Sequence, residues 1–227
     1  MLKTAAVLTA LLALAPQIAD AKCAPMNQVP KVLAKDVTAP IGGGVLVATD
    51  QVPYSVEDRG EALQPEWSFS NGSTRTKGAT VQLAPGLVVY RGKGALTDGK
   101  ETFARLTNTA AKPTALPTPK LVKVTHTATR GRRPHAETVI ELAAPPPQEV
   151  VAIVLADAAG KPRSYGLVEA GQPLTVYEHG RCGVLPNNTV ESKLGDTVTV
   201  FFVDKYGFKS AVSNKVKVRG TVDKVGD

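Results

Sequence analysis

The stretch 194–218, LGDTVTVFFVDKYGFKSAVSNKVKV, decides the fold. Its first part places apolar residues at every second position, which is the periodicity of one face of a β-strand: Val198, Val200 and Phe202. Polar and glycine residues at 204–207 then predict a reversal, and alternating valine and lysine over 212–218 predict a return strand. Two half-buried strands need a second sheet to cover them, so the stretch predicts a β-sandwich.

This hairpin resembles the last hairpin of fibronectin type III and related immunoglobulin-like domains. In those domains a strand ending in Asp, a turn with Gly, and then a Ser and a Ser-Asn pair lead into a valine-rich final strand. The matching positions are Asp204, Gly207, Ser210, Ser213 and Asn214. The resemblance implies an immunoglobulin-like sandwich for this part of the chain. It implies no activity, because many unrelated functions share that fold.

Length and composition extend the expectation to the whole chain. The 227 residues suffice for two sandwiches of about 100 residues each. Seventeen prolines and 20 glycines, with frequent valine and threonine, favour short strands and turns over long helices. We therefore predict an all-β protein with two immunoglobulin- or fibronectin-III-like sandwich domains in tandem after a signal peptide.

The N-terminal residues 1–21 are typical of a secretory signal peptide. Lys3 gives a positive start, 5–15 is an apolar run, and Ala19-Asp20-Ala21 fits a cleavage site near Ala21. The mature protein is therefore expected to be secreted, periplasmic or held at the cell surface. No later segment approaches the roughly 20 apolar residues of a membrane span, so none is predicted.

A proline-rich segment at 111–119, AKPTALPTP, predicts the domain boundary, because three prolines in nine residues favour an extended spacer. The expected organisation is listed by residue number: signal peptide 1–21, β-sandwich domain 22–110, linker 111–119, immunoglobulin-like sandwich domain 120–220 and tail 221–227. Seven candidate strands follow the linker, which is the number expected of such a sandwich.

Export would place the two cysteines, Cys23 and Cys182, in an oxidising compartment. We predict a disulfide between them, which would tie the mature N-terminus to a loop of the second domain. Two free thiols are the alternative. Lipidation of Cys23 is another, although Lys22 stands where lipidation sites usually have a small residue.

The formal net charge of +7 favours acidic partners. The densest basic segment holds Arg130, Arg132 and Arg133, which could clamp anionic groups or simply form a solvated turn. Tyr206 and Phe208, at the tip of the last hairpin, are expected to be exposed contact residues. Trp67 is either a sugar-stacking platform or a core residue. Scarce aromatics argue against nucleic-acid binding.

No catalytic residue, cofactor or metal is predicted. The hydrolase motifs G-x-S-x-G and H-E-x-x-H are absent from the sequence, and His179 with Cys182 gives too few ligands for zinc. The leading hypothesis is a secreted, non-catalytic binding or structural module whose partner is a protein or an anionic polysaccharide. The alternatives are a carbohydrate-binding module and a hydrolase or inhibitor with a site between the domains.

Overall fold

The computed structural model describes residues 30–48, 67–129, 135–179 and 197–223. Within these ranges the chain is all β and contains no helix, as the composition predicts. The predicted signal peptide, both cysteines and the three arginines of the predicted basic loop lie outside the described residues.

The part of the chain before the linker forms two sheets. The four-stranded sheet has the order β1-β3-β7-β6 and the five-stranded sheet the order β2-β9-β8-β4-β5. The strands are β1 (Lys31–Val32), β2 (Asp36–Ala39), β3 (Val45–Ala48), β4 (Ser68–Asn71), β5 (Thr74–Thr76), β6 (Ala79–Ala84), β7 (Leu87–Arg91), β8 (Gly94–Thr97) and β9 (Thr102–Asn108).

The part after the linker forms one curled sheet of seven strands with the order β13-β12-β15-β16-β10-β11-β14. The strands are β10 (Leu121–Thr129), β11 (His135–Leu142), β12 (Val150–Asp157), β13 (Pro162–Leu167), β14 (Leu174–His179), β15 (Thr197–Asp204) and β16 (Val216–Asp223). These seven strands confirm the seven candidates of the sequence. β16 runs beyond 220 into the segment expected to be a tail.

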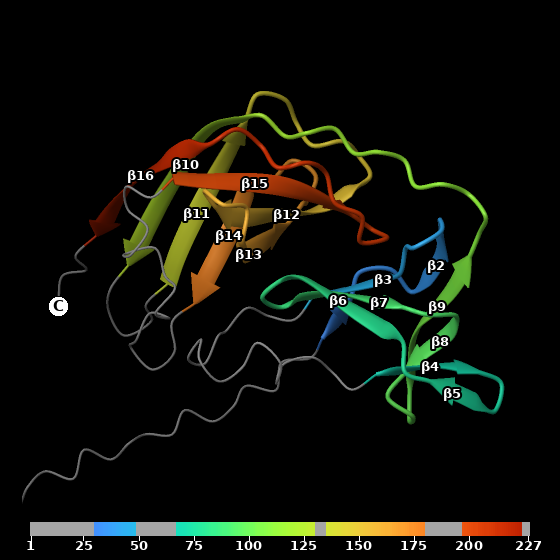
Figure 1. Ribbon diagram of the computed structural model, residues 1–227. Coiled ribbons are helices and arrows are strands. Elements are labelled where there is room, and N and C mark those ends of the chain that lie inside the picture. Colours follow the sequence, from blue (N-terminus) through green and yellow to red (C-terminus); the bar gives the residue numbers. More distant parts are fainter. Residues whose placement is uncertain (1–29, 49–66, 130–134, 180–196, 224–227) are drawn as a thin grey trace, which may run out of the picture.

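Three buried clusters hold the sheets together. The first core fills the space between the two sheets of the N-terminal half. The second core lies inside the curled seven-stranded sheet, between strands β12 and β15 and strands β10, β11, β14 and β16. The central core combines residues from both sides of the linker: Leu46, Ala48, Leu83, Ala84, Leu87 and Val89 with Ala152, Val154, Ala156, Tyr165, Phe201 and Val203. Figure 1 shows the linker passing along the outside of the molecule while the two halves meet beneath it.

The outgoing strand of the decisive stretch is buried on two faces rather than one. As predicted, Val198, Val200 and Phe202 share a face, which lies in the second core. The opposite face is also covered, because Phe201 and Val203 lie in the central core. The expectation of a half-buried strand was therefore wrong, and the reason is the sheet of the N-terminal half that packs on β15.

The return strand also differs from the prediction. It begins at Val216, and Val212, expected on its apolar side, is 43% exposed. Between the strands, the hydroxyls of Ser210 and Ser213 accept hydrogen bonds from the N–H groups of Phe202 and Val200 on β15. β16 then pairs with β15 at only two positions and runs parallel to β10 over six.

β5 and β8 are two short strands of the five-stranded sheet in the N-terminal half. β8 lies in the glycine-rich segment 92–99. A Cβ at Gly94 would lie 2.3 Å from the carbonyl oxygen of Ser70, so glycine lets β8 approach β4 closely. The Asn71-Gly72 turn joins β4 to β5, with a φ of 66° at Gly72.

Candidate functional site

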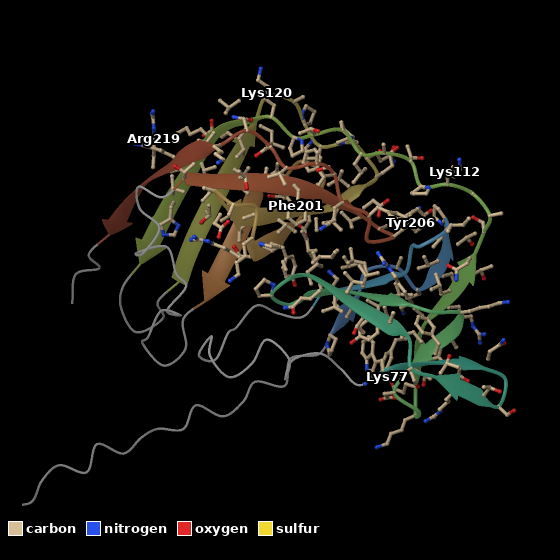
Figure 2. All side chains as sticks on the ribbon, in the orientation of Figure 1. Lys77, Lys112, Lys120, Phe201, Tyr206 and Arg219 are labelled. Carbon is tan, nitrogen blue, oxygen red and sulfur yellow. The ribbon has the colours of Figure 1, made fainter. Side chains whose placement is uncertain are left out.

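The predicted contact residues Tyr206 and Phe208 are half-buried against the N-terminal half rather than exposed at a free loop tip. Tyr206 packs on the first core, and its carbonyl oxygen accepts a 3.0 Å hydrogen bond from the N–H of Gly44. A Cβ at Gly43 would lie 3.2 Å from the Phe208 ring. Figure 2 shows Tyr206 at the meeting of the two halves. The expectation of exposure was wrong because the turn is docked.

Asp204 shapes this docked turn. Its Oδ1 accepts 2.9 Å hydrogen bonds from the N–H groups of Tyr206 and Phe208, and its carbonyl oxygen accepts one from Gly207. Burial raises the pKa of the Asp204 carboxyl above its ordinary value, and the hydrogen bonds from Phe208 and Tyr206 act in the opposite direction. These contacts explain the Asp and Gly of the sequence pattern as turn-forming residues.

Trp67 is a core residue. It is 8% exposed, stacks on Phe103 with 4.2 Å between ring centroids and lies 5.6 Å from the Tyr90 ring. A sugar-stacking platform must offer an open ring face, whereas Trp67 and Tyr90 belong to the first core and Phe103 packs against it. Of the two interpretations given by the sequence, the structure favours core packing.

A cluster of exposed cations in the N-terminal half was missed by the sequence interpretation. We call it the basic rim and define it as Arg75, Lys77, Arg91, Lys93 and Lys100. Four of these side chains are exposed and that of Arg91 is partly buried. Figure 2 shows Lys77 at the lower end of this half, near β4 and β6, on the opposite side of the view from Lys112 and Lys120.

Glycines beside two of the rim residues lie against the Phe69 ring of β4. Gly78 follows Lys77 and Gly92 follows Arg91, and a Cβ at either position would lie under 3 Å from the Phe69 ring. Both positions therefore need glycine, because any side chain there would collide with that ring. Lys93 stands between Gly92 and Gly94, where the chain passes from β7 to β8.

The β8–β9 turn adds the last member of the rim. The Arg75 Nη2 atom donates a 3.0 Å hydrogen bond to the carbonyl oxygen of Gly99, the residue before Lys100. Asp98 in this turn accepts hydrogen bonds from the N–H groups of Lys100 and Glu101. Those two backbone donors, Glu101 first, lower the pKa of the Asp98 carboxyl.

Among the residues described between 30 and 108, cations outnumber carboxylates. Between residues 30 and 108 the structure describes eight cations and three carboxylates: Lys31, Lys35, Arg75, Lys77, Arg91, Lys93, Lys100 and Arg105, with Asp36, Asp98 and Glu101. Among the described ion pairs, Lys123–Glu141 and Arg163–Asp157, neither includes a rim residue. The rim therefore presents positive charge to solvent and is suited to bind anionic groups.

A sequence signal for the rim exists in the repeated pairing of a cation with glycine: Lys77-Gly78, Arg91-Gly92, Lys93-Gly94 and Gly99-Lys100. The pairs lie on three separate turns and strand ends, so the sequence alone does not relate them in space. The three arginines that the sequence favoured lie outside the described residues, and their prediction stays open.

Comparison with known proteins assigns no relative to the chain. No family model matches it, and no curated protein is significantly similar to it in sequence. In the part of the chain that the structure describes, no helix is long and apolar enough to cross a membrane. Among the described side chains, no three metal-ligating groups converge on one point.

Proposed function

We propose that this protein is an exported, non-catalytic binding module that holds an anionic polysaccharide on its basic rim. The observation that carries the proposal is a set of five cations at strand ends and turns of the N-terminal half, four of them exposed, with no described carboxylate paired to any of them. Exposed cations attract a polyanion over a distance of about 8–10 Å at moderate salt. They also form charge-assisted hydrogen bonds once it is bound.

The architecture behind this proposal is two sandwich domains of the immunoglobulin or fibronectin III type. Two stacked sheets before the linker and a curled seven-stranded sheet after it support that division. Export rests on the signal-like residues 1–21, and a Cys23–Cys182 disulfide would fit an oxidising compartment. N-terminal sequencing of the secreted protein and non-reducing peptide mapping test these two points. An intact N-terminus or two free thiols would contradict them.

The alternative of a module that stacks neutral sugars has lost its candidate platform, since Trp67 packs in the first core. The alternative of a hydrolase or inhibitor with a site between the halves meets an apolar central core at that place. The basic rim is therefore the better starting point for experiments.

The test measures binding of the mature protein to polygalacturonate at several salt concentrations. The rim variant is Lys77→Ala/Lys93→Ala/Lys100→Ala. Its matched control, Lys112→Ala/Lys120→Ala/Lys217→Ala, removes the same charge from exposed positions elsewhere. Exposed ion pairs contribute about 0.2–1 kcal/mol each, so the rim variant should bind about tenfold more weakly. The control should lose much less affinity, and binding should weaken as salt rises.

Further binding measurements distinguish the possible outcomes. Equal losses in the rim and control variants would mean that net charge alone attracts the polymer, which would overturn the rim as a site. Binding of polyglutamate but not polygalacturonate would indicate an acidic protein partner instead. The variant Arg130→Ala/Arg132→Ala/Arg133→Ala tests the loop that the sequence favoured. A loss confined to that variant would move the site there.

A further inference from the structure

The turn between β4 and β5 carries the one Asn-Gly pair of the sequence, Asn71-Gly72. Asn71 ends β4 and pairs with Thr74 at the start of β5, so Gly72 and Ser73 form a two-residue loop. All four residues are exposed, and a Cβ at Gly72 would meet nothing within 4 Å beyond its chain neighbours. Figure 1 shows this hairpin at the end of the N-terminal half that points away from the seven-stranded sheet. The pair is therefore open to water on a projecting turn.

Asn71 differs from the two other asparagines that the structure describes. The Nδ2 atom of Asn108 donates a 2.7 Å hydrogen bond to the carbonyl oxygen of Gly92. Asn214 is held at both ends of its amide, because its Oδ1 accepts from the N–H of Leu121 and its Nδ2 donates to the carbonyl oxygen of the same residue. The side chain of Asn71 makes no hydrogen bond to any described residue. Its amide is therefore free to react.

An asparagine amide can be displaced by the backbone nitrogen of the next residue. The nitrogen of Gly72 attacks Cγ of Asn71, a new C–N bond closes a five-membered imide, and the bond from Cγ to Nδ2 breaks. The proton of the backbone N–H leaves with Nδ2 as ammonia. Water then opens the imide at either carbonyl and gives aspartate or isoaspartate. One water is consumed, one ammonia is released, and a neutral amide becomes a carboxylate. Glycine favours the attack because no Cβ crowds its nitrogen.

Local opening of β5 gives the turn the freedom that this attack needs. β5 is an edge strand of the five-stranded sheet, pairs with β4 at three positions and exposes all three of its residues. The N–H of Gly72 donates no hydrogen bond within the described part of the chain. A segment with no buried side chain opens at a small cost in free energy. The turn can therefore change its backbone angles while the rest of the protein stays folded.

Two members of the basic rim neighbour this turn. Ser70, the residue before Asn71, is the direct partner of Arg75 on β5. A Cβ at Gly94 would lie 3.5 Å from the Cβ of Asn71, and Gly94 follows Lys93. A carboxylate at position 71 would therefore add negative charge beside cations of the rim and repel an anionic ligand. Isoaspartate would also lengthen the main chain by one carbon and disturb the pairing of β5.

We propose that Asn71 converts spontaneously to aspartate and isoaspartate in the folded protein, and that this modification weakens the binding of an anionic polysaccharide to the basic rim. The conversion itself needs only the exposed turn and water. Its effect on binding rests on the proposed function. The affinity of the rim would then decline with the age of the exported protein, without the action of an enzyme.

Peptide mapping follows the conversion directly. The mature protein is kept folded in mildly alkaline buffer, which favours the deprotonated backbone nitrogen, and samples are digested with trypsin over time. The tryptic peptide 60–75 contains Asn71 and no other asparagine. It should gain the mass difference between an acid and an amide and separate into two products, aspartate and isoaspartate. The peptides that contain Asn108 and Asn214 should stay unchanged over the same period.

Binding to polygalacturonate then measures the effect on the rim. Aged wild type and fresh Asn71→Asp should both bind about two- to fivefold more weakly than fresh wild type, as expected for one exposed charge. Asn71→Gln keeps the amide but would need a six-membered imide, which forms far more slowly, so the aged variant should bind like fresh protein. Gln172→Glu makes the same amide-to-acid change at an exposed position of the other half and should leave affinity nearly unchanged.

These measurements separate the two parts of the proposal. An intact Asn71 in aged wild type, or equal conversion at Asn108 and Asn214, would overturn the modification. Complete conversion with unchanged affinity would overturn its effect on the rim, and so would an equal loss in Gln172→Glu. If fresh wild type does not bind polygalacturonate, the proposed function fails together with the effect on binding, whereas the peptide map still tests the conversion. Circular dichroism of each aged sample checks that the fold persists.

Discussion

The inner layers of this protein, the four-stranded sheet and the β12–β15 part of the seven-stranded sheet, are covered on both faces, whereas the outer layers are covered on one. The inner strands β12 and β15 carry nearly continuous apolar runs, AIVLA and VTVFFV, and bury them almost completely. The outer strand β9 instead alternates buried Ala104 and Leu106 with exposed neighbours. The length of an uninterrupted apolar run therefore reports how many layers cover a strand.

This difference makes β15 the place where the two halves depend on each other most. Its side chains alternate between the second core and the central core, so each face of one strand serves a different part of the protein. The predictions below test whether the inner layers behave as one unit and whether the outer layers behave more independently.

The largest effect is expected for Phe201→Ala, which empties a buried site in the central core. Truncating a buried phenylalanine to alanine costs about 3–5 kcal/mol of stability. Trp67 is the only tryptophan, so its fluorescence reports the N-terminal half, while far-ultraviolet circular dichroism reports both halves. Urea unfolding followed by both signals should show one transition that moves to lower urea in this variant.

Phe202→Ala is the matched comparison, since it alters the adjacent residue of the same strand and faces the second core. Its stability loss should be similar. If the central core couples the halves, the Trp67 signal shifts in both variants. A Trp67 transition that stays at the wild-type midpoint in Phe201→Ala would mean that the halves unfold separately.

The next effect concerns the docked turn at the end of β15. Gly207 has a φ of 80°, and a Cβ there would lie 2.1 Å from a methyl carbon of Val89. Gly207→Ala combines a left-handed backbone with overpacking and should cost about 3 kcal/mol. Gly171→Ala is the control, because Gly171 has a φ of 75° and nothing within 4 Å. It should cost about 1 kcal/mol, and equal losses would show that Val89 yields without penalty.

A smaller effect is expected from Asp204, whose carboxylate caps the same turn. Asp204→Ala removes the acceptor of two backbone N–H groups and should cost about 2 kcal/mol. Asp204→Asn keeps an oxygen acceptor and removes the charge, so it should be nearly neutral at neutral pH.

The pH dependence of this pair has a defined sign. Burial raises the folded-state pKa of Asp204 above its unfolded value, so the folded protein binds the proton more tightly. The stability that this proton contributes is lost as pH rises through the folded pKa and returns on acidification. In urea titrations, the stability of the wild type should rise relative to that of Asp204→Asn as the pH falls towards the unfolded-state pKa of Asp204. A relative loss over that window would contradict the burial effect.

Local patterns revealed much of the fold, and they failed where distant segments meet. Turn residues such as Asn71-Gly72 and the alternation of Val198, Val200 and Phe202 act within a few residues, so the sequence shows them directly. The burial of Phe201 depends on a sheet from the other half of the chain. Neither the apolar runs nor the turn residues specify which sheet covers Phe201.

The candidate sites were less predictable for the same reason. The residues of the basic rim come from several separate turns and strand ends, and no local pattern relates them to one another. Tyr206 and Phe208 looked like free loop-tip aromatics because no local pattern shows that their turn is docked. Each of these features needs the tertiary arrangement before its chemistry can be recognised.

The smallest effect is expected on the outer layer, at the ion pair between Lys123 and Glu141. Both side chains are about half exposed, so water screens their 3.1 Å contact. A double-mutant cycle with Lys123→Ala and Glu141→Ala should give a coupling energy of about 0.5 kcal/mol that shrinks as salt is added. A coupling above about 2 kcal/mol, beyond the usual range for exposed pairs, would mean that this outer face is shielded from water. The contrast between inner and outer layers would then fail at this end of the sheet.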